Sequence, residues 1–172
     1  LPYTFRYVHM DNTDGAIDYP DDFTNAVRIG LGVYGVSTTR PLHPVLSFYT
    51  RVAMCKKVEA NQTISYSCTY TTAEDEWICT LPVGYADGWL RKHQGRLCYI
   101  DGHYVPFVGR ICMDQCMIHV PEKMKDGTVV ELIGPHIPLV QVARELDTIP
   151  YEILCTLSDP IVRTYTYNNE YI

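Results

Sequence analysis

The chain has 172 residues and a formal net charge of −6, with 14 Lys and Arg against 20 Asp and Glu. This length fits one domain, or one domain and part of another, and is too short for a complete TIM barrel of about 250 residues. The acidic balance and the lack of a basic cluster argue against binding to nucleic acid or to an anionic membrane surface. No run of residues approaches the ~18 apolar residues of a membrane-spanning helix.

Hydrophobic residues make up 47% of the sequence, which is enough for a globular core. Seven cysteines, an odd number without tight spacing, indicate reduced thiols rather than a disulfide framework. Such cysteine usage is typical of a cytosolic protein, so we expect a cytoplasmic location.

The first forty residues have a pattern of their own. Residues 5–10 predict a short strand, a polar stretch follows, and residues 27–35 predict a buried strand. The order of strand, polar loop, strand and glycine resembles the end of an α/β barrel that has been cut off from its beginning. Residues 36–44, which contain two prolines, predict a linker. We therefore assign residues 1–40 to the end of a truncated TIM-barrel domain and residues 41–172 to a second domain.

Strand signals dominate the second domain. Two Asp-Gly pairs, at residues 101–102 and 126–127, are typical of tight turns between strands. Helices are predicted at residues 139–146 and 150–157, the second because it begins with a proline. This density of strands and turns predicts a mainly β fold, either a small barrel or a sandwich with short helices. The predicted strands are residues 45–58, 76–82, 97–100, 104–108, 110–120, 128–133 and 162–167.

Two tyrosines, Tyr66 and Tyr85, stand in turn-rich segments among glycine, serine and proline residues. Such a segment can hold a tyrosine with its hydroxyl exposed, but chemistry alone favours rings that plug one end of a barrel. Cys112, Cys116 and His119 could ligate zinc. Ligands at strand spacing splay apart, however, and paired C-x-x-C knuckles are absent, so we favour buried thiols and expect no metal.

Polar residues of the N-terminal segment could bind an anion. Arg28 enters an apolar run and must find an acceptor, because a buried unpaired charge is costly. That acceptor is a carboxylate in the structural interpretation, and an anion or a heteroaromatic nitrogen in the functional one. Asn12 and Thr13 supply an amide and a hydroxyl. Together with backbone N–H groups near Gly30 and Leu31, they can hold a phosphate at the carboxyl ends of barrel strands, although each signal is weak alone.

Five motifs follow one another along the chain: V-R-I-G-L-G-V-Y-G at 27–35, S-Y-S-C-T-Y-T at 65–71, P-V-G-Y-A-D-G-W at 82–89, V-G-R-I-C-M-D-Q at 108–115 and T-I-P-Y-E-I at 148–153. Together they resemble the C-terminal part of bacterial alanine racemases, in the order of that family. The resemblance runs from about residue 9 to residue 163. It implies a pyridoxal 5′-phosphate enzyme with an N-terminal TIM barrel and a C-terminal β-domain, here residues 41–172. It also implies a homodimer with composite active sites.

The resemblance implies a part in two-base proton transfer. Racemisation removes the α-proton from one face of an amino acid and returns it on the other, so a base is needed on each face. One base of the family is the Schiff-base lysine of the barrel. The other reaches in from the partner subunit and matches Tyr66. A phenol is a poor base at neutral pH, so Tyr66 would need cationic or hydrogen-bonding neighbours.

The resemblance also implies contacts to cofactor and substrate. Arg28 matches the arginine that donates to the pyridine nitrogen and keeps it unprotonated. The backbone N–H of Met113 matches a group that meets the substrate carboxylate in the partner's site, and Tyr85 matches a tyrosine lining the substrate channel. Asp87 and Arg110 also stand in matching motifs, but we interpret them as local structure. The contacts to the phosphate match Asn12, Thr13, Gly30 and Leu31, with Thr13 in place of the usual serine.

One departure from the family changes the substrate pocket. Asp159 stands where the family has a tyrosine that touches the phosphate and narrows the pocket. A carboxylate is shorter and more polar, and it repels a phosphate unless it is paired. Serine-racemising relatives of vancomycin-resistance systems also have a smaller polar residue there, so we hypothesise that the intact enzyme accepts serine as well as, or instead of, alanine. A protein of that type would also carry a membrane domain, with this chain on the cytoplasmic side.

A second departure concerns the Schiff-base lysine, because the barrel-like part of the sequence contains no lysine. We therefore expect the chain to be a fragment, or a separately made domain, that neither binds the cofactor covalently nor racemises alone. The five lysines are Lys56, Lys57, Lys92, Lys123 and Lys125.

A non-catalytic interpretation competes with this one. Free thiols, buried tyrosines and an acidic surface also suit a β-domain that serves dimerisation or binds a small ligand. The substitution Tyr66→Phe separates the two interpretations. A structural domain tolerates it, whereas a racemase loses proton abstraction from one face and keeps cofactor binding.

Overall fold

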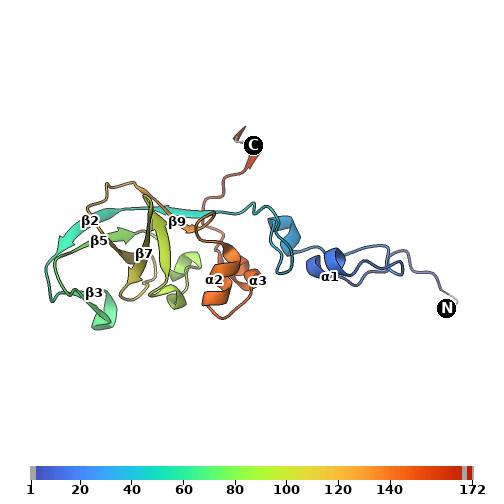
Figure 1. Ribbon diagram of the computed structural model, residues 1–172, viewed down its shortest axis with the longest axis horizontal. Helices are drawn as coiled ribbons and strands as arrows, with labels where there is room; N and C mark the ends of the chain where they lie inside the picture. Colours follow the sequence, from blue (N-terminus) through green and yellow to red (C-terminus); the bar gives the residue numbers. More distant parts are fainter. Residues whose placement is uncertain (1–2, 168–169, 172) are drawn as a thin grey trace.

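The computed structural model describes residues 3–167 and 170–171 and shows a mainly β protein (Figure 1). Its largest element is an antiparallel sheet of seven strands, in the order β1-β9-β6-β7-β8-β5-β2. The predicted mainly β fold with short helices is confirmed. The seven strands are β1 (Phe48–Arg51), β2 (Met54–Val58), β5 (Glu76–Leu81), β6 (Leu97–Ile100), β7 (His103–Val108), β8 (Cys116–Val120) and β9 (Val129–Ile133).

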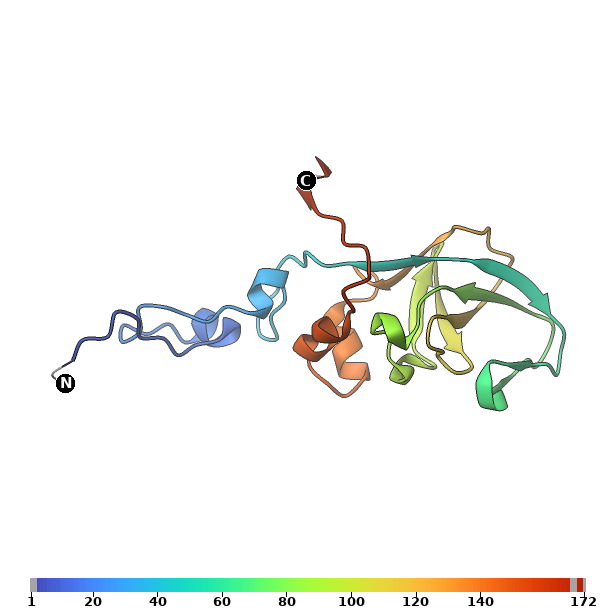
Figure 2. The ribbon, with the colours of Figure 1, turned by 180° about the vertical axis from the view of Figure 1, so that it is seen from behind.

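The two edge strands of the sheet are consecutive in the chain. β1 pairs with β9 and β2 pairs with β5, and only Val52 and Ala53 lie between β1 and β2. The change of partner takes place at these two residues. The N–H of Val52 donates to the carbonyl of Thr128 (2.9 Å), whereas the N–H of Ala53 donates to Thr80 (2.9 Å). Because β1 and β2 follow each other in the chain and form the two edges of the sheet, the sheet curls into a half-barrel (Figures 1 and 2). The sandwich, which was the other predicted arrangement, does not form.

One large hydrophobic cluster joins the sheet to two helices. α2 (Leu139–Glu145) and α3 (Pro150–Thr156) contribute Val142, Ala143 and Ile153 to it, and they confirm the two predicted helices. The removal of this apolar surface from water is the main stabilising contribution to the fold. The fully buried residues of the sheet in this cluster are Cys79, Leu81, Cys98, Ile100, Cys116, Ile118, Val130 and Leu132.

The strand predicted at residues 45–58 begins at Phe48 and is divided into β1 and β2, and two other predicted strands are shorter than expected. Residues 110–120 predict one strand, but only β8 forms there, because Gly109 has a φ of +67° and the chain enters a loop. Of residues 162–167, only Thr166–Tyr167 (β10) is a strand in the described part of the chain. The strands predicted at residues 76–82, 97–100, 104–108 and 128–133 match β5, β6, β7 and β9.

The N-terminal segment extends away from the sheet (Figures 1 and 2). The strands predicted at residues 5–10 and 27–35 are wrong, since the described residues there share one parallel bridge, between His9 and Ala26. Val27 is 48% exposed rather than buried. A buried parallel strand needs a hydrogen-bonding neighbour on each side and cover on both faces, which this segment does not provide for itself. The predicted remnant of a TIM barrel is therefore not visible as a sheet.

Short helices and hairpins connect the larger elements. In the described part of the chain, no helix combines the length and the apolar character needed to cross a membrane. The short elements are α1 (Thr13–Asp18), η1 (Leu31–Tyr34), β3 (Thr63–Ile64), η2 (Tyr66–Cys68), β4 (Tyr70–Thr71), η3 (Tyr85–Asp87), η4 (Arg91–His93) and β11 (Glu170–Tyr171).

Candidate functional site

The predicted site residues form two groups that lie far apart in the molecule. Thr13, Gly30 and Leu31 meet in the N-terminal segment, and we call them the cradle. Tyr66 and Tyr85 line a pocket of the β-domain, which we call the tyrosine pocket. In Figure 1, α1 marks the side of the cradle and β3 marks the side of Tyr66, with α2 and the sheet between them. One chain therefore does not bring Tyr66 to its own cradle.

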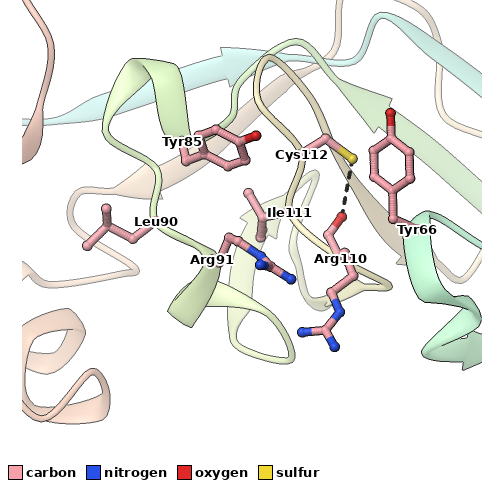
Figure 3. A pocket seen from close by; sticks show the side chains of 7 residues that line it. All are labelled: Tyr66, Tyr85, Leu90, Arg91, Arg110, Ile111 and Cys112. Atoms are coloured by element: carbon pink, nitrogen blue, oxygen red, sulfur yellow. Dashed lines mark hydrogen bonds between the residues drawn. The ribbon is translucent and has the colours of Figure 1, made fainter.

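The tyrosine pocket has a volume of about 560 Å³, a size typical of small-molecule sites. Figure 3 shows Tyr66 reaching it from the turn after β3, Tyr85 from η3 and Arg91 from η4. Leu90, directly before η4, and the loop after β7 form the remaining wall. The lining residues are Tyr66, Tyr85, Leu90, Arg91, Arg110, Ile111 and Cys112.

The turn that carries Tyr66 has an unusual backbone. Ser65, Ser67 and Cys68 have φ values of +66°, +61° and +48°. A left-handed conformation costs an L-residue roughly 1–2 kcal/mol, and such strain is concentrated at functional sites. The Tyr66 side chain is 73% exposed and Tyr85 is 42% exposed. The alternative in which both rings plug the end of a barrel is therefore wrong.

The Tyr66 turn is anchored to the loop after β7. The hydroxyl of Ser65 donates to the carbonyl of Arg110 (2.8 Å). Gly109 has a φ of +67°, and a Cβ at this position would lie 2.7 Å from the carbonyl oxygen of Ile64 and 2.8 Å from Cβ of Ser65. Only glycine permits this approach. The tight contact places Tyr66 beside Arg110.

Two guanidinium groups give the tyrosine pocket a positive charge. Arg91 and Arg110 lie near each other on the same side of the pocket in Figure 3. No carboxylate of the described residues forms an ion pair with either arginine. The Nε atom of Arg110 is buried and has no hydrogen-bond partner in that part of the chain. Cations without a counterion stabilise an anion that enters the pocket, including a phenolate.

Tyr85 and Met113 are held side by side by their backbones. The N–H of Tyr85 donates to the carbonyl of Cys112 (3.1 Å). The N–H of Ala86 donates to the carbonyl of Met113 (2.9 Å). Gly84 allows this contact, since a Cβ there would lie 2.2 Å from the Met113 carbonyl oxygen. The N–H of Met113 has no acceptor among the described residues, so it is available to a carboxylate.

Asp159 lies in the loop after α3, which packs on η3. The N–H of Ser158 donates to the carbonyl of Asp87 (3.2 Å). Gly88 makes the contact possible, because a Cβ there would lie 1.9 Å from the carbonyl oxygen of Thr156. The Asp159 side chain is exposed, and it does not line the tyrosine pocket. Within the described residues its carboxylate has no ion-pair partner.

Thr13 joins the two loops of the cradle. Its side chain is only 2% exposed. Its hydroxyl oxygen accepts hydrogen bonds from the N–H groups of Gly30 (3.2 Å) and Gly32 (3.0 Å). The N–H of Leu31, between these two, points to the hydroxyl oxygen of Tyr151 on α3, at 3.5 Å. The cradle therefore contacts α3 as well.

Asn12 and Arg28 have structural partners in the same segment. The side-chain oxygen of Asn12 accepts from the N–H of Gly15 (2.9 Å) and so caps α1. The guanidinium of Arg28 donates to the carbonyl of Met10. If Arg28 had only a structural role, we would expect it to pair with a carboxylate. Among the described residues it forms no such ion pair. A guanidinium has five N–H groups, so Arg28 keeps donors for a ligand.

Asp14 ties α1 to the chain that follows η1. Its carboxylate accepts hydrogen bonds from the hydroxyls of Ser37 (2.6 Å) and Thr38. These hydrogen bonds hold the pKa of Asp14 below its ordinary value. The ionised carboxylate therefore fixes the two loops that form the cradle.

The donors of the cradle fit the phosphate of a cofactor. The hydroxyl of Thr13 accepts two N–H groups, which leaves its own proton free to donate. The N–H of Leu31 makes only a long contact, at 3.5 Å. Gly30 has no side chain, and a Cβ there would lie 2.9 Å from the Tyr151 ring. The residues present thus suit a group that accepts several hydrogen bonds at a close-packed backbone.

The three zinc ligands considered from the sequence do not form a cluster. Cys112 lies in the loop after β7, whereas Cys116 and His119 lie on β8. Nowhere in residues 3–167 or 170–171 do three or more His, Cys, Asp or Glu side chains gather as metal ligands. All seven cysteines are free thiols. Burial raises the pKa of the Cys116 thiol well above its usual value, so it stays neutral.

Three residues of these groups were missed or misjudged from the sequence. Arg110 was interpreted as local structure but lines the tyrosine pocket. The same interpretation was right for Asp87, whose carboxylate accepts a hydrogen bond from the N–H of Gly84 (2.9 Å). Arg91 stands in an ordinary basic run and gave no signal. Tyr151 reaches Leu31 across 120 positions of sequence, and its only signal was its place in a family motif.

Comparison with known proteins identifies relatives of the chain. Residues 45–165 match the family described as "Alanine racemase, C-terminal domain". The alanine racemase of Ligilactobacillus salivarius is 42% identical over 171 residues, which cover 93% of this chain and 46% of that protein. The chain thus spans about half the length of the relatives it matches.

Solved structures are similar over the same length. The alanine racemase from Bacillus anthracis with bound L-Ala-P has a TM-score of 0.92 and 40% identity, covering 96% of this chain and 46% of that chain. The alanine racemase from Bartonella henselae with covalently bound pyridoxal phosphate has a TM-score of 0.82 and 33% identity, covering 89% and 45%. With a family match over more than half of its residues and a half-barrel fold that its relatives share, the chain belongs to the alanine racemase C-terminal domain family.

Proposed function

We propose that the chain is the C-terminal part of a pyridoxal 5′-phosphate-dependent alanine racemase. It contributes Tyr66 as one of two proton-transferring bases, and its cradle as part of a cofactor site. The observation that carries the proposal is the exposed Tyr66 phenol, held by a strained turn in a cationic pocket. The relatives are alanine racemases, and a phenol held in this way would suit the proton transfer that racemisation requires.

The cofactor contacts would come from the N-terminal segment. When bound, pyridoxal phosphate supplies an electron sink for the charge left on the α-carbon. Thr13, Gly30 and Leu31 would hold its phosphate, and Arg28 would donate to its ring nitrogen. Because a guanidinium stays protonated in proteins, Arg28 can only donate, so that nitrogen stays unprotonated. Asn12 would act by capping α1 and fixing Thr13.

Tyr66 would carry the proton on one face of the substrate. Its phenolate oxygen accepts the α-proton from that face, or its phenol returns a proton there in the opposite direction. Arg91 and Arg110 line the same pocket, and they would offset the charge of the phenolate once its oxygen, which is directed away from both guanidiniums in Figure 3, turns toward them. The sequence has no lysine before Lys56. The second base and the covalent attachment of the cofactor would therefore belong to the part of the relatives that this chain does not match, and the chain alone would not racemise.

The active sites would be composite, each built from two subunits. Tyr66 and the cradle are separated by the sheet and α2 (Figure 1), so one subunit cannot present both to one substrate. A homodimer in which each subunit lends its Tyr66 to the partner's cradle removes this difficulty. A C2 arrangement produces two identical sites of this kind.

The substrate would be held by the residues beside Tyr66. The unpaired N–H of Met113 would meet the substrate carboxylate, and Tyr85 would line the approach to it. The exposed carboxylate of Asp159, on the loop packed against η3, would make the partner-built pocket wider and more polar than a tyrosine would. We extend the proposal to serine as a second substrate on this ground.

The domain boundary is part of the same proposal. Residues 1–40 would be the end of a TIM barrel, and residues 41–172 the β-domain. The parallel bridge between His9 and Ala26 supports this division, since neighbouring strands of a TIM barrel pair in parallel. The family match, which begins at residue 45, supports it as well. Seven free thiols support a cytoplasmic location.

Racemisation by the dimeric protein that carries these residues tests the proposal. The assay follows exchange of the α-hydrogen in deuterated water, with each enantiomer of alanine and of serine. Tyr66→Phe is expected to keep cofactor binding and to lower racemisation about 10²–10⁴-fold, with exchange lost from one enantiomer. Tyr104→Phe, an exposed tyrosine outside the pocket, is the matched control and should behave as wild type.

The same assay separates the alternatives. Full racemisation by the Tyr66→Phe protein would favour the non-catalytic β-domain, which serves dimerisation or binds a small ligand. Wild-type turnover of alanine with serine at background would remove the serine extension and leave the rest of the proposal in place.

A further inference from the structure

The contact between α3 and the cradle has no part in the function proposed so far. We propose that the hydroxyl of Tyr151 is a further ligand of the phosphate held by the cradle. The identity of the molecule that carries this phosphate rests on the proposed function. The contact itself rests on the positions of Tyr151, Gly30 and Leu31.

The Tyr151 ring lies directly on the backbone of the cradle. A Cβ at Gly30 would be 2.9 Å from Cε1 of the ring and 3.0 Å from its hydroxyl oxygen. A side chain at position 30 would therefore displace the ring, and glycine is what permits the approach. Tyr151 is still 39% exposed, so the ring is packed on one side and open on the other.

The hydrogen-bond donors near Tyr151 lie close together, and the only acceptor that the described residues offer them is at a long distance. Its hydroxyl oxygen receives the N–H of Leu31 at 3.5 Å, and its own proton has no acceptor among the described residues. Hydrogen bonds from these groups to an oxyanion are about 2.7–2.9 Å long. Two donor atoms 3.5 Å apart can therefore both reach one phosphate oxygen. The free proton of the Thr13 hydroxyl adds a third donor on the same loops.

The charges around the cradle are compatible with an anion. The carboxylate of Asp14 is occupied by the hydroxyls of Ser37 and Thr38. Arg28 precedes Gly30 by two residues and keeps N–H groups free. The hydroxyl of Tyr151 adds one more hydrogen-bond donor beside the cradle.

A purely structural role is the competing explanation, in which Tyr151 only packs α3 against the N-terminal segment. Tyr151→Phe keeps the ring on Gly30 and removes only the hydroxyl. A packing role therefore predicts no change in phosphate binding for this variant. A ligand role predicts weaker binding with an unchanged fold.

The full chain, titrated with inorganic phosphate at constant ionic strength, distinguishes the two roles. Binding is followed through the backbone amide resonances of Gly30 and Leu31. The wild-type protein is expected to show saturable shifts, and Tyr151→Phe to bind about tenfold more weakly, the effect of one hydrogen bond to a charged group. Tyr165→Phe, which removes the hydroxyl of an exposed tyrosine elsewhere, should bind as wild type.

A second variant changes the same contact from the side of the cradle. Gly30→Ala is expected to displace the Tyr151 ring and to weaken phosphate binding to a similar degree or more. Equal binding by wild type and Tyr151→Phe overturns the inference, and so does the lack of saturable shifts in the wild type. Loss of racemisation in Tyr66→Phe does not depend on this result, so the inference and the proposed function can fail separately.

Discussion

Tyr66 depends on backbone conformations that its own sequence does not announce. The segment Ser65-Tyr66-Ser67-Cys68 contains no glycine, yet three of its residues have positive φ. No rule of local propensity predicts left-handed serine or cysteine, because both residues adopt other conformations at lower cost. The turn-rich segment indicated that the Tyr66 hydroxyl can be exposed, but only the family motif pointed to Tyr66 as a base. The exposure of its phenol became evident only from the structure.

Replacing Gly109 by alanine tests how the Tyr66 turn is held. Gly109 and Gly102 both have positive φ, +67° and +85°, so alanine is strained at each position by about 1 kcal/mol. Only the Cβ at position 109 meets the backbone of Ile64, while nothing lies within 4 Å of a Cβ at position 102. Gly109→Ala is expected to lower the free energy of unfolding by at least about 1 kcal/mol more than Gly102→Ala. Urea unfolding measures the difference, and equal effects would show that the contact with Ile64 is unimportant.

At the scale of elements, the predictions succeeded where partners are close in sequence. The hairpin of β6 and β7 was predictable because Asp-Gly is a preferred pair for a type I′ turn, which requires positive φ at both residues. Asp101 and Gly102 both have positive φ in the structure. The strands predicted at residues 5–10 and 27–35 failed because buried parallel strands depend on neighbours that local sequence does not supply. The bend between β1 and β2 at Val52 was also invisible, since it results from a change of pairing partner.

The short helix η4 supports the core through a buried histidine. The His93 ring is 1% exposed and stacks on Trp89, with ring centroids 3.5 Å apart. Nη1 of Arg96 lies 2.9 Å from Nδ1 of His93 and donates to it. Burial, together with the charge of Arg96, lowers the pKa of His93 from 6.5 to about 3. His93 is therefore neutral in the folded protein at neutral pH.

This buried histidine predicts how stability depends on pH. Below about pH 6.5 the unfolded chain protonates His93 and the folded protein does not, so the free energy of unfolding falls as the pH falls toward 3. The loss approaches about 1.4 kcal/mol per pH unit for this one group. In His93→Phe the slope is expected to decrease by that amount. His103→Phe, at an exposed histidine, should keep the wild-type slope. Equal slopes for both variants between pH 6.5 and 4 would contradict the account.

At the scale of the whole molecule, the two halves of the candidate site face different places. The sequence motifs contain most residues of the cradle and of the tyrosine pocket. They could not reveal that the sheet separates the cradle from the pocket (Figure 1). Nor could they reveal the contact of Tyr151 with Leu31, which joins distant parts of the chain. Such long-range placements depend on how the half-barrel and its helices pack, and not on any local pattern.

Mixing two defective variants of the dimeric enzyme tests the composite site most directly. One variant carries Tyr66→Phe and the other carries Arg28→Ala, and each is expected to be nearly inactive alone. After dissociation and reassociation, a mixed dimer has one site with both residues intact, so the mixture should recover about a quarter of the wild-type racemisation rate. No recovery on mixing, with mixed dimers shown to form, would mean that Tyr66 acts within its own subunit and would contradict the central claim.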